Sequence, residues 1–142
     1  MKPTYKFLEH TADILFQAKA ETLGELFEQC ALAVEESMIK LKQIQPKKEI
    51  KIKGKNLKLE YLLFDFLNDL LFYKDAQQLL LSKFKCTVKE GKNGYELNCS
   101  AFGEKLNPEK HEQKVDVKAI TMHLFEIKKK GKSWMAQVLI DI

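Results

Sequence analysis

The stretch LKLEYLLFDFLNDLLF, residues 57–72, decides how the rest of the chain must be arranged. Leucine or phenylalanine recurs there at three- and four-residue steps, the spacing that brings side chains to one face of an α-helix. The apolar stripe is wide, and Phe64 and Phe72 widen it further, while Asp65 and Asp69 lie on the one polar flank. A helix this apolar is covered on most of its sides. We therefore expect a buried helix around which the other elements pack.

A second, amphipathic helix is predicted ahead of this stretch. Thr22-Leu-Gly-Glu25 has the form of a capping box, in which Thr22 is the N-cap and Glu25 reaches back. Apolar residues then recur at helical steps: Leu23, Leu26, Phe27, Cys30, Ala31, Val34, Met38 and Leu41. One face of this helix is therefore expected to pack on the rest of the protein.

The remaining segments predict β-strands. Gly-Lys-Asn-Gly at 91–94 and Lys-Lys-Gly-Lys at 129–132 are hairpin turn signals, because glycine and asparagine accept positive φ. Strand patterns occur at residues 5–9, 14–20, 50–52, 84–90, 95–102, 115–128 and 133–142. Strands clustered around two long helices indicate an α+β fold, with both helices packed on a mixed, mainly antiparallel sheet. No repeat or linker divides the chain, so a single domain over residues 1–142 is predicted.

Length and composition describe a globular protein. The 142 residues are about one domain's length, and 45% hydrophobic with 31% charged residues is not the composition of a disordered or fibrous chain. No apolar run approaches the roughly 18 residues that span a bilayer, and the first residues lack the apolar stretch of a secretory signal. We therefore expect a cytoplasmic protein with no membrane partner. The three cysteines form no CxxC pair and are expected to be buried free thiols.

The basic residues are all lysines, 24 of them against 20 acidic residues, which gives a net charge of +4. Surfaces that read nucleic acid usually include arginine, whose planar fork grips phosphate at two points. The absence of arginine argues against direct RNA readout, and the lysines are interpreted as a solvated surface.

Two aspartates stand at strand ends. Asp13 follows the turn that contains His10, and Asp141 lies on the last strand next to Ile142. A single charged residue at a strand end is usually just solvated. If the first and last strands lie side by side, however, Asp13, Asp141 and the terminal carboxylate of Ile142 form a cluster of oxygen ligands. Such ligands suit a hard divalent cation such as Ca²⁺ or Mg²⁺, with water in the remaining positions.

The histidines show no HxH or HExxH spacing, so a zinc centre is only weakly supported. His10 lies three residues before Asp13 and is suited to orient that carboxylate or to contact a partner. His123 alternates with its neighbours in a predicted strand. It is interpreted as a hydrogen-bonded core histidine or as one that hydrogen-bonds to a metal-ligating residue. Nucleophile elbows and phosphate-binding loops are absent, which argues against independent ligase or kinase chemistry.

Six short sequence blocks occur in order along nearly the whole chain. They are residues 7–13 (FLEHTAD), 22–28 (TLGELFE), 64–71 (FDFLNDLL), 103–104 with 108–111 (GE and PEKH), 117–123 (VKAITMH) and 138–142 (VLIDI). Each block is weak alone, but six in register are specific, and together they resemble the archease family. The chain departs from the family pattern at Ile14-Leu15, Phe66, Asp69 and Met122, where apolar character or charge is kept.

The resemblance implies an accessory protein of tRNA splicing that is not itself an enzyme. Archeases assist the RtcB-type ligase that seals tRNA halves: they promote its guanylylation, support multiple turnover and broaden the nucleotides that it accepts. Family members bind a divalent cation through residues that match Asp13, Asp141 and Ile142. We expect Ca²⁺ here, with Mg²⁺ or Mn²⁺ as alternatives. The ligase is the expected partner, with tRNA contacted only indirectly, and Lys118 is expected to contact an acidic partner surface or a phosphate.

Two other classes of function stay open. A chaperone-like or RNA-binding module would act without the ligase, and RNA binding would be sensitive to salt. A metal-dependent hydrolase using Asp13, Asp141 and a histidine would turn over substrate alone, but it would need two or more converging carboxylates and a clear general base, and the sequence offers few such groups.

Overall fold

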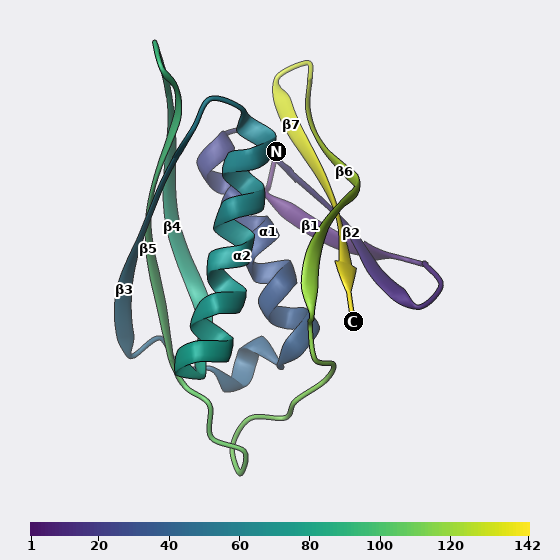
Figure 1. Cartoon of the computed structure of the whole chain (residues 1–142), viewed down its shortest axis with the longest axis vertical. Coiled ribbons are helices and arrows are strands. Elements are labelled where there is room, and N and C mark those ends of the chain that lie inside the picture. The colour runs from purple at the N-terminus through teal and green to yellow at the C-terminus, as the bar shows by residue number, and fades with distance from the viewer.

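A computed structural model describes residues 1–142, with two helices lying between two β-sheets (Figure 1). The elements in chain order are β1 (Thr4–Leu8), β2 (Asp13–Ala20), α1 (Leu23–Met38), the short 3-10 turn η1 (Leu41–Gln43), β3 (Lys48–Asn56), α2 (Leu59–Gln77), β4 (Leu79–Gly91), β5 (Gly94–Lys105), β6 (Ala119–Lys130) and β7 (Ser133–Asp141). Helix α1 packs against β4 on one side and β2 on the other, while α2 packs against β6 and β3. The helices thus form the middle layer of a three-layer sandwich.

Every strand pair is antiparallel. One sheet has the order β1-β2-β7-β6 and the other has the order β3-β5-β4. The predicted α+β class, with two long helices packed on antiparallel strands, is confirmed. One detail differs, because the strands form two wholly antiparallel sheets where the sequence patterns predict one mixed sheet. A helix that is apolar on most sides needs cover from two directions, which a single sheet does not provide.

Aromatic side chains of α2 reach both sheets, which accounts for its wide apolar surface. Phe66 stacks on Phe27 of α1 with ring centroids 5.8 Å apart and meets Phe84 of β4 edge to face at 6.4 Å. Phe64 meets Phe125 of β6 edge to face at 5.9 Å. The exception to the predicted stripe is a phenylalanine in the last turns of α2, since Phe72 is 60% exposed.

The prediction that Thr22 is the N-cap of α1 is confirmed. Thr22 Oγ1 accepts a hydrogen bond from the N–H of Glu25 at 3.2 Å, and the Thr22 hydroxyl donates to Glu25 Oε1 at 2.9 Å. At the other end of the helical layer, Gln78 adopts φ 53° and ends α2. The chain therefore enters β4 at Leu79, earlier than the alternating pattern indicates. No helix is both long enough and apolar enough to cross a membrane.

Candidate functional site

The pairing of β2 with β7 brings Asp13 directly opposite Asp141. Directly opposed residues of an antiparallel pair have side chains on the same face of the sheet. The neighbouring residues Ile14 and Ile140 pack on the core, so alternation puts both carboxylates on the outer face, away from the helices. It is thus the second strand, β2, and not the first that lies beside the last strand, and this pairing brings the two carboxylates together as a cluster requires.

His10 and Ala12 shape the turn that leads into Asp13. His10 Nδ1 lies 3.9 Å from Asp13 Oδ2, and the two side chains are 30% and 31% exposed. Ala12 has φ 69°, in the left-handed region that costs a residue other than glycine about 1–2 kcal/mol. This conformation turns the chain so that imidazole and carboxylate lie at ion-pair distance while solvent still reaches both groups.

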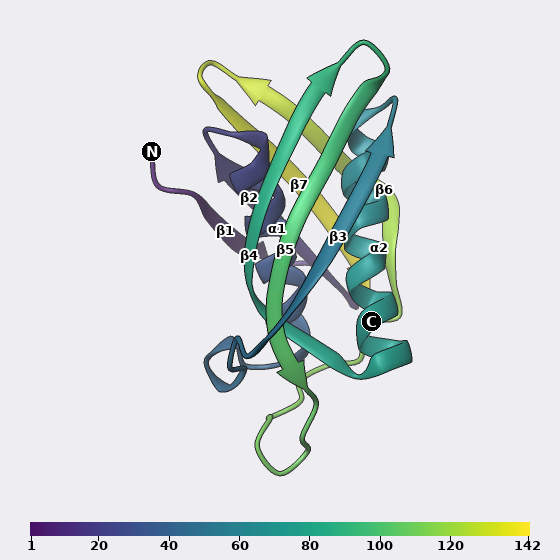
Figure 2. The same ribbon diagram turned by 90° about the vertical axis from the view of Figure 1, so that its left-hand side faces the viewer.

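Lys118 and Ile142 lie at the same end of the sheet. The Lys118 N–H donates to the carbonyl of Asp141 at 2.8 Å, while the Lys118 side chain is exposed. The side chain of Ile142 packs against the core. The C-terminus and the β1–β2 turn lie close to this end in both ribbon views (Figures 1 and 2). We call this region the acidic tip; it comprises His10, Asp13, Lys118, Asp141 and Ile142.

His123 lies outside the acidic tip, in an irregular part of β6. The register with β7 shifts between Thr121 and Glu126, so the residues between them bulge from the sheet. Leu124 has φ 60°, and its carbonyl accepts a hydrogen bond from Gln137 Nε2 at 3.0 Å. His123 itself is exposed. The interpretation of His123 as a core histidine is therefore wrong, because the bulge breaks the alternation on which it depended.

Apart from the imidazole of His10 and the ammonium group of Lys118, the polar groups of the acidic tip are oxygen atoms that could coordinate a cation. No group of three or more His, Cys, Asp and Glu side chains in the chain is arranged to hold a metal ion. The tip offers two side-chain carboxylates, from Asp13 and Asp141, with the main chain of Ile142 next to them. Oxygen ligands that leave room for water are the type that Ca²⁺ and Mg²⁺ use. In chemical type the residues fit a hard cation, provided that water completes its coordination.

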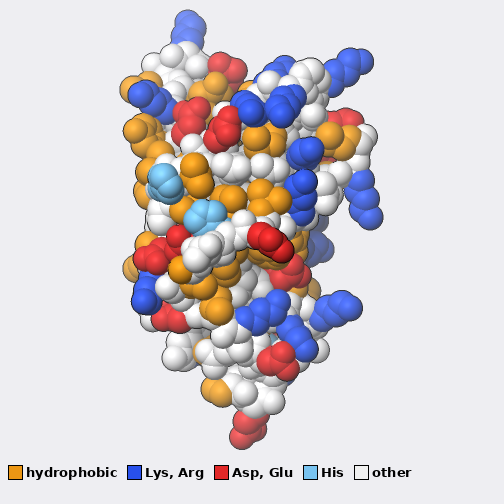
Figure 3. Space-filling view, turned by 90° about the vertical axis from the view of Figure 1, so that its right-hand side faces the viewer, with side chains coloured by type: hydrophobic (Ala, Val, Ile, Leu, Met, Phe, Trp, Pro, Cys, Tyr) orange, Lys and Arg blue, Asp and Glu red, His pale blue; other side chains and the backbone are white.

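A pocket of about 300 Å³ opens beside Asp13, between β1, β2, the end of α1 and the segment that follows β5. Its lining consists of Phe7, Leu8, Asp13, Ile14, Glu36, Ser37, Lys114 and Val115. Two of these side chains, Phe7 and Val115, are 43% and 38% exposed. Figure 3 looks onto the four-stranded side of the molecule, where hydrophobic, acidic and histidine side chains gather in the middle of the surface. A partner that reaches Asp13 would also meet apolar surface.

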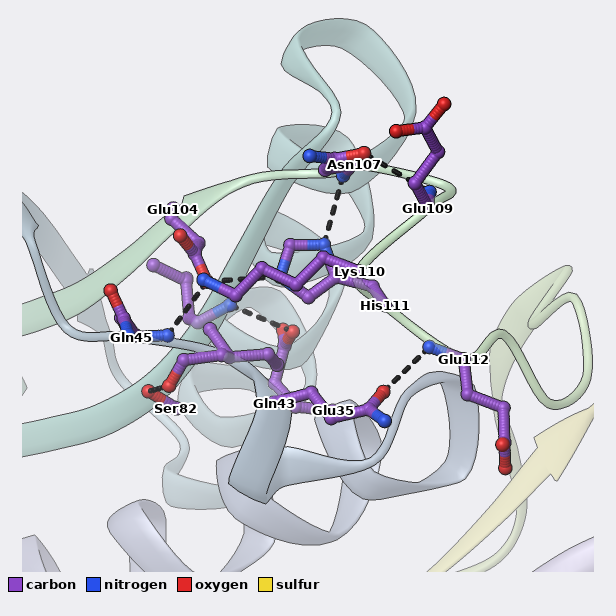
Figure 4. A network of polar contacts seen from close by, with 12 residues as sticks. Glu35, Gln43, Gln45, Ser82, Glu104, Asn107, Glu109, Lys110, His111 and Glu112 are labelled. Carbon is purple, nitrogen blue, oxygen red and sulfur yellow. Dashed lines mark hydrogen bonds and ion pairs between the residues drawn. The ribbon is translucent and has the colours of Figure 1, made fainter.

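Sequence patterns do not identify the polar network around Glu104 (Figure 4). Glu104 Oε2 lies 2.9 Å from His111 Nε2 and 2.7 Å from Lys110 Nζ, and it accepts a hydrogen bond from the N–H of Gln45 at 2.8 Å. Burial alone would raise the pKa of Glu104, but the hydrogen bonds from Gln45, Lys110 and His111 outweigh it and lower the pKa to about 2.

This network anchors the long connection from β5 to β6. His111 is buried, and its Nδ1 accepts a hydrogen bond from the N–H of Asn107 at 2.8 Å. Further along, the N–H of Lys114 donates to the carbonyl of Met38 at 2.7 Å. The connection continues to Lys118, which lies in the acidic tip. The signal available in the sequence is the block in which Gly103-Glu104 precedes His111, which marks the residues but not their contact.

Comparison with known proteins agrees with the six sequence blocks. The model of the Archease protein family (MTH1598/TM1083) matches residues 5–142. The chain is 40% identical over 139 residues to protein archease of Thermococcus kodakarensis, with 97% of this chain and 98% of that one covered. The solution structure of protein 1598 of Methanobacterium thermoautotrophicum is similar at a TM-score of 0.86 and 33% identity, covering 97% of this chain and 98% of that one.

A more distant structure has the same fold. The crystal structure of an archease from Thermotoga maritima, described as a possible chaperone, matches at a TM-score of 0.64 and 23% identity, with 96% of both chains covered. The family model and the 40% identical relative each span nearly the whole chain. The chain therefore belongs to the archease family.

Proposed function

We propose that this chain is a non-catalytic accessory factor that activates an RtcB-type RNA-splicing ligase in the cytoplasm. In this role it promotes guanylylation of the ligase, supports multiple turnover and broadens the nucleotides that the ligase accepts, and the activating site meets tRNA only through the ligase. Membership of the archease family supports this proposal. The single observation that carries it is the direct opposition of Asp13 and Asp141 at a solvent-accessible end of the sheet.

The acidic tip would act as a carrier of a divalent cation. Asp13, Asp141 and the terminal carboxylate of Ile142 would hold the ion, with Ca²⁺ favoured and Mg²⁺ or Mn²⁺ as alternatives. When bound, the ion supplies positive charge near a triphosphate, which is the requirement of nucleotidyl transfer. His10, 3.9 Å from Asp13, would hold that carboxylate in position.

Contacts around the tip would dock it on the ligase. Lys118 is exposed beside Asp141 and would meet an acidic surface or a phosphate of the partner. The pocket beside Asp13, with the exposed ring of Phe7 at its edge, would receive an apolar side chain. His123 in the exposed β6 bulge would add a further contact. Interfaces usually combine an apolar anchor with a polar rim, and this region offers both.

The test uses the RtcB-type ligase from the same source, with guanylylation and multiple-turnover RNA sealing as readouts. Asp13→Asn and Asp141→Asn are each expected to lower the stimulation at least about 10-fold, as loss of a metal-supporting group does. Glu90→Gln is the matched control, because Glu90 is an exposed carboxylate on the β4–β5 hairpin, which belongs to the other sheet and lies away from the C-terminus (Figure 1). All three variants should keep the thermal unfolding midpoint of the wild-type protein.

A titration with CaCl₂ tests whether the two aspartates bind a cation, separately from whether they contact the ligase. Calorimetric binding of Ca²⁺ by the wild-type protein, lost in Asp13→Asn and Asp141→Asn, is the expected result. Full ligase stimulation by both aspartate variants would overturn the proposal.

A chaperone-like action on the partner is a second candidate. Exposed apolar side chains support it, namely Phe7, Val115, Met122 and Leu124, as does the description of the Thermotoga maritima structure as a possible chaperone. In that case the protein would suppress heat aggregation of the ligase, and Asp13→Asn would suppress it equally well. Light scattering of the heated ligase, with wild-type protein or Asp13→Asn added, distinguishes the two functions.

A further inference from the structure

The outer face of the three-stranded sheet is not covered by any other element. In Figure 2, β4, β5 and β3 lie in front of the helices. The strand register aligns their outward side chains in four rows of three. In the order β3, β5, β4 the rows are Glu49–Phe102–Lys83, Lys51–Ser100–Lys85, Lys53–Asn98–Thr87 and Lys55–Glu96–Lys89. We call these residues the lysine face.

The lysine face carries the whole net charge of the protein. It holds six lysines and two glutamates, a net charge of +4. The full chain has 24 lysines and 20 acidic residues, so the remaining 18 of each sign cancel. The positive charge of the lysine face lowers the pKa of Glu49. The main cause is the hydrogen bond and ion pair with Lys51 at 2.8 Å, and the charge of Lys85 adds to it.

The lysines form two columns with a polar strip between them. Alternate residues of a strand lie about 6.8 Å apart and neighbouring strands about 4.8 Å apart, so the face is about 20 Å long and its lysine columns are about 10 Å apart. A hollow of about 330 Å³ lies on this surface, lined by Lys51, Lys53 and Lys85 and by the polar side chains of Thr87, Asn98 and Ser100. Lys53, Lys55, Lys85 and Lys89 form no ion pair.

We propose that the lysine face binds the phosphodiester backbone of RNA, with the strand lying between the two lysine columns. Lysine ammonium groups are mobile point charges that neutralise phosphates without reading sequence. The length of the face corresponds to about four nucleotides, the lower end of site sizes for single-stranded binders. The arginine-free composition counts against sequence readout, and the proposal requires none.

The central strip favours RNA over other polyanions. Asn98, Ser100 and Thr87 present both donors and acceptors, which suit the 2′-hydroxyl that only RNA carries. An acidic protein surface would need an apolar anchor as well, and the face has only Phe102, whose ring is already covered by Lys83 Nζ at 5.5 Å from its centroid. The binding is independent of ligase activation, since the lysine face and the acidic tip lie on different sheets.

The experiment measures fluorescence anisotropy of a fluorescein-labelled single-stranded RNA oligonucleotide with the full chain and no ligase. The face variant is Lys53→Gln/Lys55→Gln/Lys85→Gln. The control is Lys128→Gln/Lys130→Gln/Lys132→Gln, which removes the same charge from exposed lysines of the β6–β7 hairpin on the other sheet. The same oligonucleotide made as DNA and a poly-glutamate competitor of equal charge complete the set.

For about four phosphate contacts, the slope of log K against log salt concentration is expected to be about −3 between roughly 50 and 200 mM salt. The face variant should weaken binding at least about 10-fold and reduce the slope by about 2, while the control stays within about twofold of wild type. DNA should bind more weakly than RNA, and poly-glutamate should not displace the RNA. Absence of RNA binding, or an equal loss in the control variant, would overturn the proposal and leave the lysines as protection for the two edge strands. So would equal binding of DNA, or displacement by poly-glutamate.

Discussion

Glu35 is a carboxyl group inside the helical layer. It has no exposed surface, its Oε1 accepts a hydrogen bond from the N–H of Leu81 at 3.0 Å, and its Oε2 has no partner. Burial raises its pKa to about 8, against the smaller opposing effects of the Leu81 N–H and of Lys74. Glu35 follows Ala31 by four residues and precedes Met38 by three, so the helical period puts it on the buried face of α1.

Because the pKa of Glu35 is raised in the folded protein, we expect the free energy of unfolding to fall as the pH rises. The unfolded carboxyl ionises near 4.5, whereas the folded one keeps its proton to about pH 8, so the folded state binds more protons between these values. The free energy of unfolding should therefore decrease across this window, by up to about 5 kcal/mol. Glu35→Gln keeps an acceptor for Leu81 and does not ionise, so it should be the more stable protein at pH 8.

Urea unfolding of both proteins at a series of pH values from 4 to 9 measures this difference. The difference in unfolding free energy between Glu35→Gln and wild type should grow through the window and level off above it. A difference that is constant with pH would show that Glu35 ionises normally in the folded protein.

The residues of the acidic tip show how far single positions can be interpreted. The chemistry of Asp13 and Asp141 is apparent from their residue type and their strand-end positions. Their meeting is not, because it depends on pairing between β2 and β7. His10 follows from local spacing to Asp13, and the structure gives their distance as 3.9 Å. The prediction that His123 is a core histidine is wrong, because its exposure depends on a bulge in β6 that no local sequence pattern indicates.

At the scale of elements, helix α1 and strand β4 approach each other closely at Gly24. A Cβ atom built on Gly24 would overlap the carbonyl oxygen of Cys86. The close packing of α1 on β4 therefore requires a glycine at this place in the Thr22-Leu-Gly-Glu25 capping segment. The same strand supplies the Cys86 N–H, which donates to Glu28 Oε2 at 2.7 Å.

Gly24→Ala tests this contact. In a free helix alanine would stabilise by about 1 kcal/mol relative to glycine. Here the overlap with Cys86 forces α1 and β4 apart, so we expect a net loss of about 1–3 kcal/mol in unfolding free energy, measured by urea denaturation. Gly91→Ala is the control, because no atom lies within 4 Å of a Cβ at that glycine. A Gly24→Ala protein as stable as wild type would contradict the close approach.

At the scale of the whole molecule, the two sheets share one core. A single cluster of 34 buried residues contains side chains from both helices and both sheets. Neither sheet has another apolar layer to pack on, so neither should remain folded once the helices leave. We therefore expect the two sheets to unfold together.

Two local probes test this cooperativity. Trp134, the only tryptophan, lies on β7 of the four-stranded sheet, while Cys86 and Cys99 are buried opposite each other in the three-stranded sheet. In a Cys30→Ala protein, which leaves only the thiols of the three-stranded sheet, tryptophan fluorescence and the accessibility of Cys86 and Cys99 to a disulfide reagent should give the same urea midpoint. Separate midpoints would show that one sheet survives without the other.

Local patterns in the sequence suffice to predict the two helices and the turns that close the hairpins, and the six blocks suffice to identify the family. These features rest on helical periods, caps and turn residues, in which interacting positions are only a few residues apart. Other features emerge only when the chain is folded: the strands divide into two sheets, Asp13 faces Asp141, Glu35 is buried and six lysines share one face. These features depend on strand register between distant segments, which the packing of the whole core sets.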